Sequence, residues 1–167
     1  MKRLVKLFQT GSAVLAVASL LLAAQTNSMV GTWKLNVADS KFSSAAPPKS
    51  ATRTVEAQTD GLSVSYEFVA SDGSITKYSY TANFDAKDYP ISGSGTNWRE
   101  DMVGGAESIA LRRAGSNAYA GALKKSGNVV MTTKTVLSKD GKVTTITRNG
   151  VDAKGQPTKE VSIWDKQ

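Results

Sequence analysis

Three arginines stand in alternating segments where the residues two positions away are aliphatic. If the aliphatic residues face a protein interior, the arginine of the same parity faces it too. A guanidinium is costly to bury unpaired, and the acid group of a bound ligand can partner it through two parallel hydrogen bonds. We therefore treat these arginines as candidate ligand-binding residues: Arg53 in phase with Ala51 and Val55, Arg113 with Ile109 and Leu111, and Arg148 with Ile146.

A second interpretation of these arginines requires no ligand. Each stands near the end of its segment, where a long side chain can reach solvent at a rim. Each can also pair with an acidic side chain of the same chain, for which Glu56, Glu67 and Asp165 are candidates. Because arginine is rarely fully buried, the rim position or an internal ion pair is the default expectation.

Aromatic residues gather in two neighbouring segments, 62–68 and 75–84, which the turn sequence Ser71-Asp72-Gly73 separates. Two strands joined by a tight turn place such rings opposite each other. The rings then line a pocket or fill a packed core, and both outcomes suit a small barrel. The candidate ligand-binding aromatics are Tyr66, Phe68, Tyr78 and Tyr80.

The residue types that are missing exclude several kinds of chemistry. With no histidine and no cysteine, a Ser-His-Asp triad, a cysteine nucleophile and an ordinary zinc site are ruled out. The acidic pairs Asp85/Asp88 and Glu100/Asp101 could in principle perform acid–base chemistry, but turn positions favour solvated acids. The glycine-rich stretch 92–95 has no following helix to hold a phosphate. We expect no enzyme activity, no cofactor and no metal.

The elements that must position these residues are short strands separated by turn residues. Residues 62–68 give the clearest alternation, with Leu62, Val64, Tyr66 and Phe68 on one face. Further strands are expected at 52–57, 75–84, 108–113, 119–124, 129–137, 143–148 and 159–165. A hairpin-connected series of this length predicts an all-β fold, a single antiparallel up-and-down barrel of about 8–10 strands, with a two-sheet sandwich as the alternative.

Two stretches depart from this pattern. Asp39 or Ser40 could cap a single helical turn that tucks Phe42 onto the core. Residues 97–103, between glycine-rich stretches, are expected to form a mobile loop or a weak edge strand. Trp98 in that stretch is expected to be exposed, where it would gate an open end, contact a partner or anchor the loop.

The first 26 residues have the pattern of a secretory signal peptide. Lys2, Arg3 and Lys6 precede an apolar run that is too short for a comfortable membrane span. We expect residues 1–26 to be removed and residues 27–167 to form one domain, periplasmic or secreted, with an uncleaved leader as the alternative and the only membrane contact. Loss of the three leader charges lowers the formal net charge from +7 to +4, with scattered lysines, so we expect no nucleic-acid partner.

Short motifs spread over residues 27–167 resemble a known group of proteins. They are Gly31-Thr32-Trp33-Lys34-Leu35-Asn36, Ser40-Lys41-Phe42, Asp88-Tyr89-Pro90, Ser138-Lys139-Asp140-Gly141-Lys142 and Asp165-Lys166-Gln167. With the β-meander they resemble bacterial exported lipocalin-like proteins of the calycin superfamily. The resemblance implies that Gly31 and Trp33 close one end of the barrel, with Trp33 against a basic residue near the C-terminus. The usual lipocalin C-terminal helix is not evident, which also fits a barrel of the fatty-acid-binding type.

Two functions from different classes follow. In the first, which the resemblance favours, the barrel carries a small hydrophobic or amphipathic molecule, and an open cavity lies beside Tyr66 and Tyr80 with an inward arginine. In the second, the barrel is filled and acts as an envelope or protein-interaction module through a patch near Trp98. The sequence leaves the identity of the ligand and the oligomeric state open.

Overall fold

The computed structural model describes residues 29–42, 46–151 and 155–167. The predicted signal peptide, residues 1–26, lies outside the described residues. The strands are β1 (Gly31–Lys41), β2 (Ser50–Ala57), β3 (Gly61–Val69), β4 (Ile75–Asn83), β5 (Asp88–Ser94), β6 (Ser108–Gly115), β7 (Ala118–Lys125), β8 (Asn128–Leu137), β9 (Val143–Val151) and β10 (Pro157–Lys166), and one short helix, α2 (Trp98–Val103), stands between β5 and β6.

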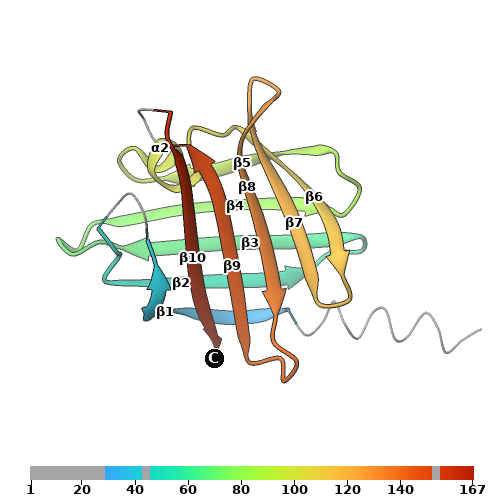
Figure 1. Ribbon diagram of the computed structural model, residues 1–167, viewed down its shortest axis with the longest axis horizontal. Helices are drawn as coiled ribbons and strands as arrows, with labels where there is room; N and C mark the ends of the chain where they lie inside the picture. Colours follow the sequence, from blue (N-terminus) through green and yellow to red (C-terminus); the bar gives the residue numbers. More distant parts are fainter. Residues whose placement is uncertain (1–28, 43–45, 152–154) are drawn as a thin grey trace, which may run out of the picture.

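The ten strands form one closed antiparallel barrel in which each strand pairs with its neighbours in sequence. Closure comes from β1, which pairs with β2 on one side and with β10 on the other. Figure 1 shows β8, β9 and β10 crossing in front of β2, β3 and β4 at a steep angle. The predicted all-β up-and-down barrel is confirmed, and the sandwich alternative is wrong, because the ladder between β1 and β10 leaves no open edge.

The alternation in β3 decides which side chains face the interior. Leu62, Val64, Tyr66 and Phe68 are all buried, whereas Ser65 is exposed. The neighbouring strand β4 follows the same rule and buries Tyr78 and Tyr80. Period-two alternation with one apolar face thus places the predicted aromatic residues inside the barrel.

One end of the barrel, here called the Trp33 end, is closed by Trp33, whose side chain is 0% exposed. Its indole Nε1 donates a hydrogen bond to the carbonyl oxygen of Met29 at 3.1 Å. The Nζ of Lys166 lies 5.3 Å from the centroid of the Trp33 ring, a cation–π distance. Gly31 has a φ of 133°, and a Cβ there would stand 3.2 Å from Cε of Lys166, so glycine suits this close approach.

The expected helical turn at Asp39 and Ser40 is wrong, because β1 runs on to Lys41. The ladder between β1 and β10 is irregular between Asn36 and Lys41. The Ser40 hydroxyl donates to the carbonyl oxygen of Asn36 at 2.6 Å and accepts from the backbone N–H of Ile163 at 2.9 Å. The Ser40 hydroxyl therefore connects β1 and β10 at the irregularity. Serine, which often caps helices, here stabilises a strand instead.

The stretch 97–103 is also different from expectation, because it contains α2 at the opposite end of the barrel, here called the α2 end (Figure 1). Residues with positive φ lie on both sides of the helix: Gly95, Asn97, Gly104 and Gly105. Trp98 is half-buried and not exposed. Its ring fills the space beside Gly93, where a Cβ would lie 2.5 Å from the ring atom Cε3.

Candidate functional site

Arg53 of β2 is 0% exposed inside the barrel. Its Nε donates to the hydroxyl of Tyr66 at 3.1 Å, and its Nη2 donates to the hydroxyl of Tyr119 at 2.6 Å. Its Nη1 has no hydrogen-bond partner among the described residues. The default expectation of a rim position or an ion pair with an acidic side chain is therefore wrong for Arg53, whose side-chain hydrogen bonds within the described residues go only to tyrosine hydroxyls.

Arg148 of β9 lies half-buried on the α2 side of the same interior. Its Nη2 donates to the hydroxyl of Tyr78 at 2.7 Å, and its Nη1 lies 3.4 Å from the carbonyl oxygen of Met102 in α2. The guanidinium carbons of Arg53 and Arg148 lie 5.7 Å and 6.0 Å from the centroid of the Tyr66 ring. Two positive groups therefore stand around one aromatic ring in the barrel interior.

The electrostatics of this cluster are set by burial and by tyrosines. Burial raises the pKa of Tyr78 and of Tyr80 well above their ordinary value, although Arg148 opposes the shift at Tyr78. Both phenols are therefore neutral near pH 7. Burial acts against the charge of Arg53, yet its pKa is raised, because Tyr119, Tyr66 and Tyr80 lie close to the guanidinium and Tyr66 accepts a hydrogen bond from it.

Arg148 behaves in the same way. Burial opposes its charge, Tyr78 and Tyr66 act in favour of it, and the carboxylate of Glu160 adds to them, so the pKa of Arg148 is raised. Both guanidiniums are charged at every physiological pH. Glu160 offers part of the compensation for Arg148, whereas the groups that stabilise Arg53 are neutral hydroxyls.

A small cavity lies next to the arginine cluster, towards the α2 end. Its volume is about 20 Å³, and Tyr66, Tyr78, Tyr80 and Arg148 contribute to its lining. Met102 and Val103 of α2 close it on one side. On this measure of volume a water molecule needs roughly 10–15 Å³, so the cavity has room for one or two waters.

The predicted aromatic residues meet as a stack. The rings of Tyr66 and Tyr78 lie 4.5 Å apart at 20°, and the ring of Phe68 lies 6.0 Å from that of Tyr66. Trp164 of β10 meets Tyr66 edge-on at 5.8 Å. The structure thus brings together all four predicted aromatics, Tyr66, Phe68, Tyr78 and Tyr80, with two of the three predicted arginines.

Arg113 does not join this cluster, because it is exposed on β6 near the Trp33 end. Its guanidinium carbon lies 4.4 Å from the centroid of the Phe84 ring. The parity with Leu111 holds along the strand, but from Arg112 onward the side chains of β6 are exposed. For Arg113 the predicted rim position describes the structure, and the inward position is wrong.

Two residues of the site were not predicted, Tyr119 and Met102. Tyr119 stands on β7 in phase with Leu123, and both are buried. That parity was a usable signal for an inward tyrosine. Met102 reaches the cavity because α2 folds over the barrel end. The alternation that predicts strands gives no indication of that helix.

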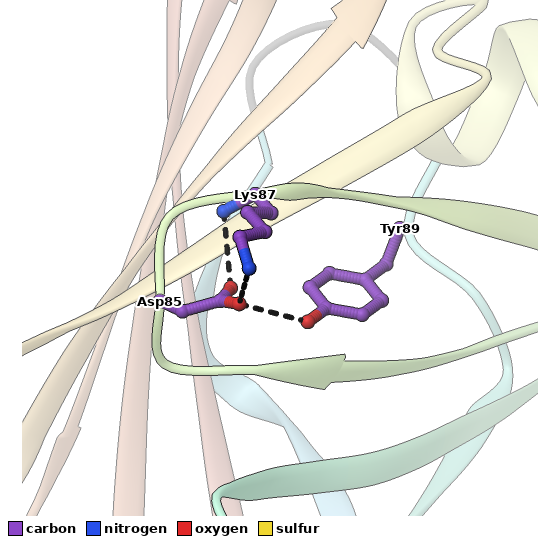
Figure 2. A network of polar contacts seen from close by, with 3 residues as sticks. All are labelled: Asp85, Lys87 and Tyr89. Carbon is purple, nitrogen blue, oxygen red and sulfur yellow. Dashed lines mark hydrogen bonds and ion pairs between the residues drawn. The ribbon is translucent and has the colours of Figure 1, made fainter.

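Among the acidic residues considered for acid–base chemistry, Asp85, Asp88 and Asp101 are exposed. Asp85 lies in the β4–β5 turn, where it accepts hydrogen bonds from the Lys87 backbone N–H and the Tyr89 hydroxyl, both at 3.1 Å, and pairs with the Lys87 ammonium at 3.4 Å (Figure 2). These contacts, the Lys87 N–H first, lower the pKa of Asp85. Asp88 pairs with Lys124 at 2.7 Å. Figure 2 shows how the Asp85 carboxylate contacts Lys87 and Tyr89 and so stabilises the turn.

No protein-family model matches the chain, and no curated protein matches it in sequence. Among residues 29–42, 46–151 and 155–167, no group of three or more acidic side chains is placed to hold a metal ion. Within those same ranges, no helix has the length and apolar character needed to cross a membrane. The closed antiparallel ten-stranded barrel is consistent with a lipocalin-like fold.

Proposed function

We propose that the barrel binds a small amphipathic molecule that carries an acidic group, and that this group sits against Arg53 and Arg148. The observation that carries the proposal is Arg53, fully buried with Nη1 unpartnered among the described residues and with neutral hydroxyls as its other partners. An uncompensated buried guanidinium costs several kcal/mol. A carboxylate ligand would supply the missing charge and a bidentate acceptor.

The surroundings of the two arginines suit the rest of such a molecule. Tyr66, Tyr78 and Tyr80 line the cavity, so aromatic carbon atoms and phenolic hydroxyls both lie beside it. Because the cavity holds only about 20 Å³, an apolar tail fits only when Met102 and Val103 withdraw with α2. The route of access in this proposal is therefore the α2 end, since Trp33 fills the other end.

We further assign the chain to exported lipocalin-like proteins that act in the periplasm or outside the cell. The Gly31-Thr32-Trp33 pattern and the ammonium of Lys166 over the Trp33 ring support this assignment. The charged n-region and apolar run of residues 1–26 support export. On this proposal the protein is a carrier and not an enzyme.

One observation favours the second candidate function, an envelope or protein-interaction module without a small ligand. The barrel interior is largely filled, and a cavity of about 20 Å³ is far below the roughly 300–1,000 Å³ of usual ligand sites. Another observation counts against this candidate: the Trp98 ring packs beside Gly93, so part of the exposed patch that such a module was expected to use is not present.

The test is native mass spectrometry of the exported protein purified from its own host, followed by titration with two probes of equal chain length, dodecanoic acid and dodecanol. We expect a bound acid to leave on mild activation, and dodecanoate to bind at least tenfold more tightly than dodecanol, since a charged hydrogen bond contributes about 1.5–3 kcal/mol. A clean apo mass with no binding of either probe would leave the filled module as the function.

Matched variants connect the binding to the two arginines. Arg53→Met and Arg148→Met should each weaken dodecanoate binding at least tenfold and leave dodecanol binding within about twofold. The control is Arg112→Met, which removes an exposed arginine on the outer face of β6 and should change neither. Equal affinity for dodecanoate in all three variants would contradict the proposed head-group site, and the half-buried Arg148 keeps the test valid if Arg53→Met fails to fold.

A further inference from the structure

The outer surface of five adjacent strands carries a row of hydroxyl side chains in exact cross-strand register. Thr32 of β1 pairs with Thr54 of β2, which pairs with Ser65 of β3. The row continues from Ser65 to Ser79 of β4 and from Ser79 to Ser92 of β5. Adjacent strands lie about 4.8 Å apart, so the row presents a regular series of hydroxyls over roughly 19 Å.

A second row runs beside the first and is electrically balanced. Thr52 pairs with Glu67, Glu67 with Lys77, and Lys77 with Ser94. The Nζ of Lys77 lies 2.6 Å from Oε2 of Glu67. Within β2 to β5 the ion pair balances the two charges of this row, and Lys34 continues the register on β1.

The residues of these two rows that stand on β2 to β5 line a groove of about 480 Å³ on the outside of the barrel. Its volume lies within the roughly 300–1,000 Å³ of usual ligand sites, in contrast to the small interior cavity. The lining includes six serine and threonine side chains from four strands: Thr52, Thr54, Ser65, Ser79, Ser92 and Ser94.

The hydroxyls of the first row are available for a ligand. Thr32, Ser65, Ser79 and Ser92 are exposed and Thr54 is half-buried. By contrast, Thr81 and Ser63, one register step further, hydrogen-bond each other at 3.1 Å. A serine or threonine hydroxyl both donates and accepts, which matches the hydroxyl groups of a sugar ring in either role.

We propose that this groove binds a neutral polysaccharide chain lying across β2 to β5. A linear polysaccharide repeats its hydroxyl groups once per sugar ring, so successive rings meet successive strands of the sheet. The balanced charge of the groove favours a neutral chain over an acidic one. The site lies on the outside of the barrel, and it stands independently of any ligand bound inside.

The test is native gel electrophoresis of the whole exported protein in gels that contain hydroxyethyl cellulose, laminarin or dextran, three neutral polysaccharides, with acidic alginate as a fourth probe. We expect at least one neutral polysaccharide to retard the protein. Ser65→Ala with Ser79→Ala should weaken that retardation about tenfold, because two hydrogen bonds at the centre of the groove are lost. The control pair Thr145→Ala with Thr147→Ala, on the outward parity of β9, should leave it unchanged.

Three outcomes would overturn the proposal. Retardation by alginate alone would reduce the effect to the positive charge of the protein. Retardation of the Ser65→Ala with Ser79→Ala variant equal to that of the Thr145→Ala with Thr147→Ala control would show that the polysaccharide binds outside the groove. A concentration-dependent dimer that Ser65→Ala with Ser79→Ala abolishes, measured by analytical ultracentrifugation, would make the groove an interface between two copies of the chain.

Discussion

Arg53 and Tyr119 join opposite parts of the barrel through a hydrogen bond of 2.6 Å from Nη2 to the phenolic hydroxyl. The two residues stand on β2 and β7, 66 positions apart in the chain. Because Arg53 is fully buried, this bond and the one to Tyr66 hold a charge that is otherwise surrounded by protein. The barrel thus keeps a cation in its interior with neutral hydroxyls as partners, and the proposed binding of an acidic group rests on this arrangement.

Removal of the Tyr119 hydroxyl should destabilise the protein. Tyr119→Phe leaves a second guanidinium nitrogen of Arg53 without its partner, and hydrogen bonds to charged groups contribute about 1.5–3 kcal/mol. Tyr89→Phe is the matched control, since its hydroxyl meets Asp85 in an exposed turn and should cost less than about 0.5 kcal/mol. Urea unfolding of both variants measures the difference, and equal midpoints would contradict the importance of the buried bond.

Replacement of Gly93 should disturb the attachment of α2. A Cβ at Gly93 would lie 2.5 Å from both the carbonyl oxygen of Lys77 and Cε3 of Trp98, so Gly93→Ala should cost about 1–3 kcal/mol through overpacking and change the fluorescence of Trp98. Gly150→Ala is the control, because its nearest neighbour, the carbonyl oxygen of Val130, is 3.4 Å away. Similar stability and fluorescence in both variants would show that Trp98 is free to shift.

The strands and their inward faces were predictable because both are local properties. The alternation from Leu62 to Phe68 and the turn residues between segments are visible in any short window, and the structure places the strand at Gly61–Val69. Closure followed from the number of hairpin-connected strands, since a long meander otherwise leaves an exposed edge. The helix α2 was missed because six residues are too few to display a helical period.

The arginine cluster was only partly predictable. Parity indicated that Arg53 and Arg148 point inward, but it cannot distinguish a buried centre from a rim, as Arg113 shows by its exposure. The contact between Arg53 and Tyr119 depends on the tilt and stagger of the closed barrel. Those quantities join strands distant in sequence, and no local pattern encodes them.

Trp33 should contribute more to stability than the other tryptophan at a barrel end. Trp33→Phe removes a fully buried ring edge and the hydrogen bond to Met29, and we expect a loss of about 2 kcal/mol. Trp98→Phe is the control, because its ring is only half-buried. Thermal and urea unfolding compare the two, and a larger loss for Trp98→Phe would contradict the role of Trp33 in closing the barrel.

Stability should fall steeply in alkali because of the buried tyrosines. Burial raises the pKa of Tyr78 and of Tyr80 above the ordinary value of 10.0, so the folded protein keeps protons that the unfolded chain releases. Their contribution is fully present below pH 10.0 and is lost as the pH rises above it, at up to about 1.4 kcal/mol per pH unit for each group.

Urea midpoints measured from about pH 9 to pH 11.5 test this expectation. Tyr80→Phe removes one of the two groups whose pKa is raised. The decline of the unfolding free energy with pH should become shallower by the contribution of one proton, up to about 1.4 kcal/mol per pH unit. Tyr89→Phe, which removes a hydroxyl that donates to Asp85 in an exposed turn, is measured beside it as the same chemical change outside the barrel interior. A Tyr80→Phe variant with an undiminished slope would show that Tyr80 ionises in the folded barrel; burial and the neighbouring Tyr119 oppose that ionisation, although Arg53 favours it.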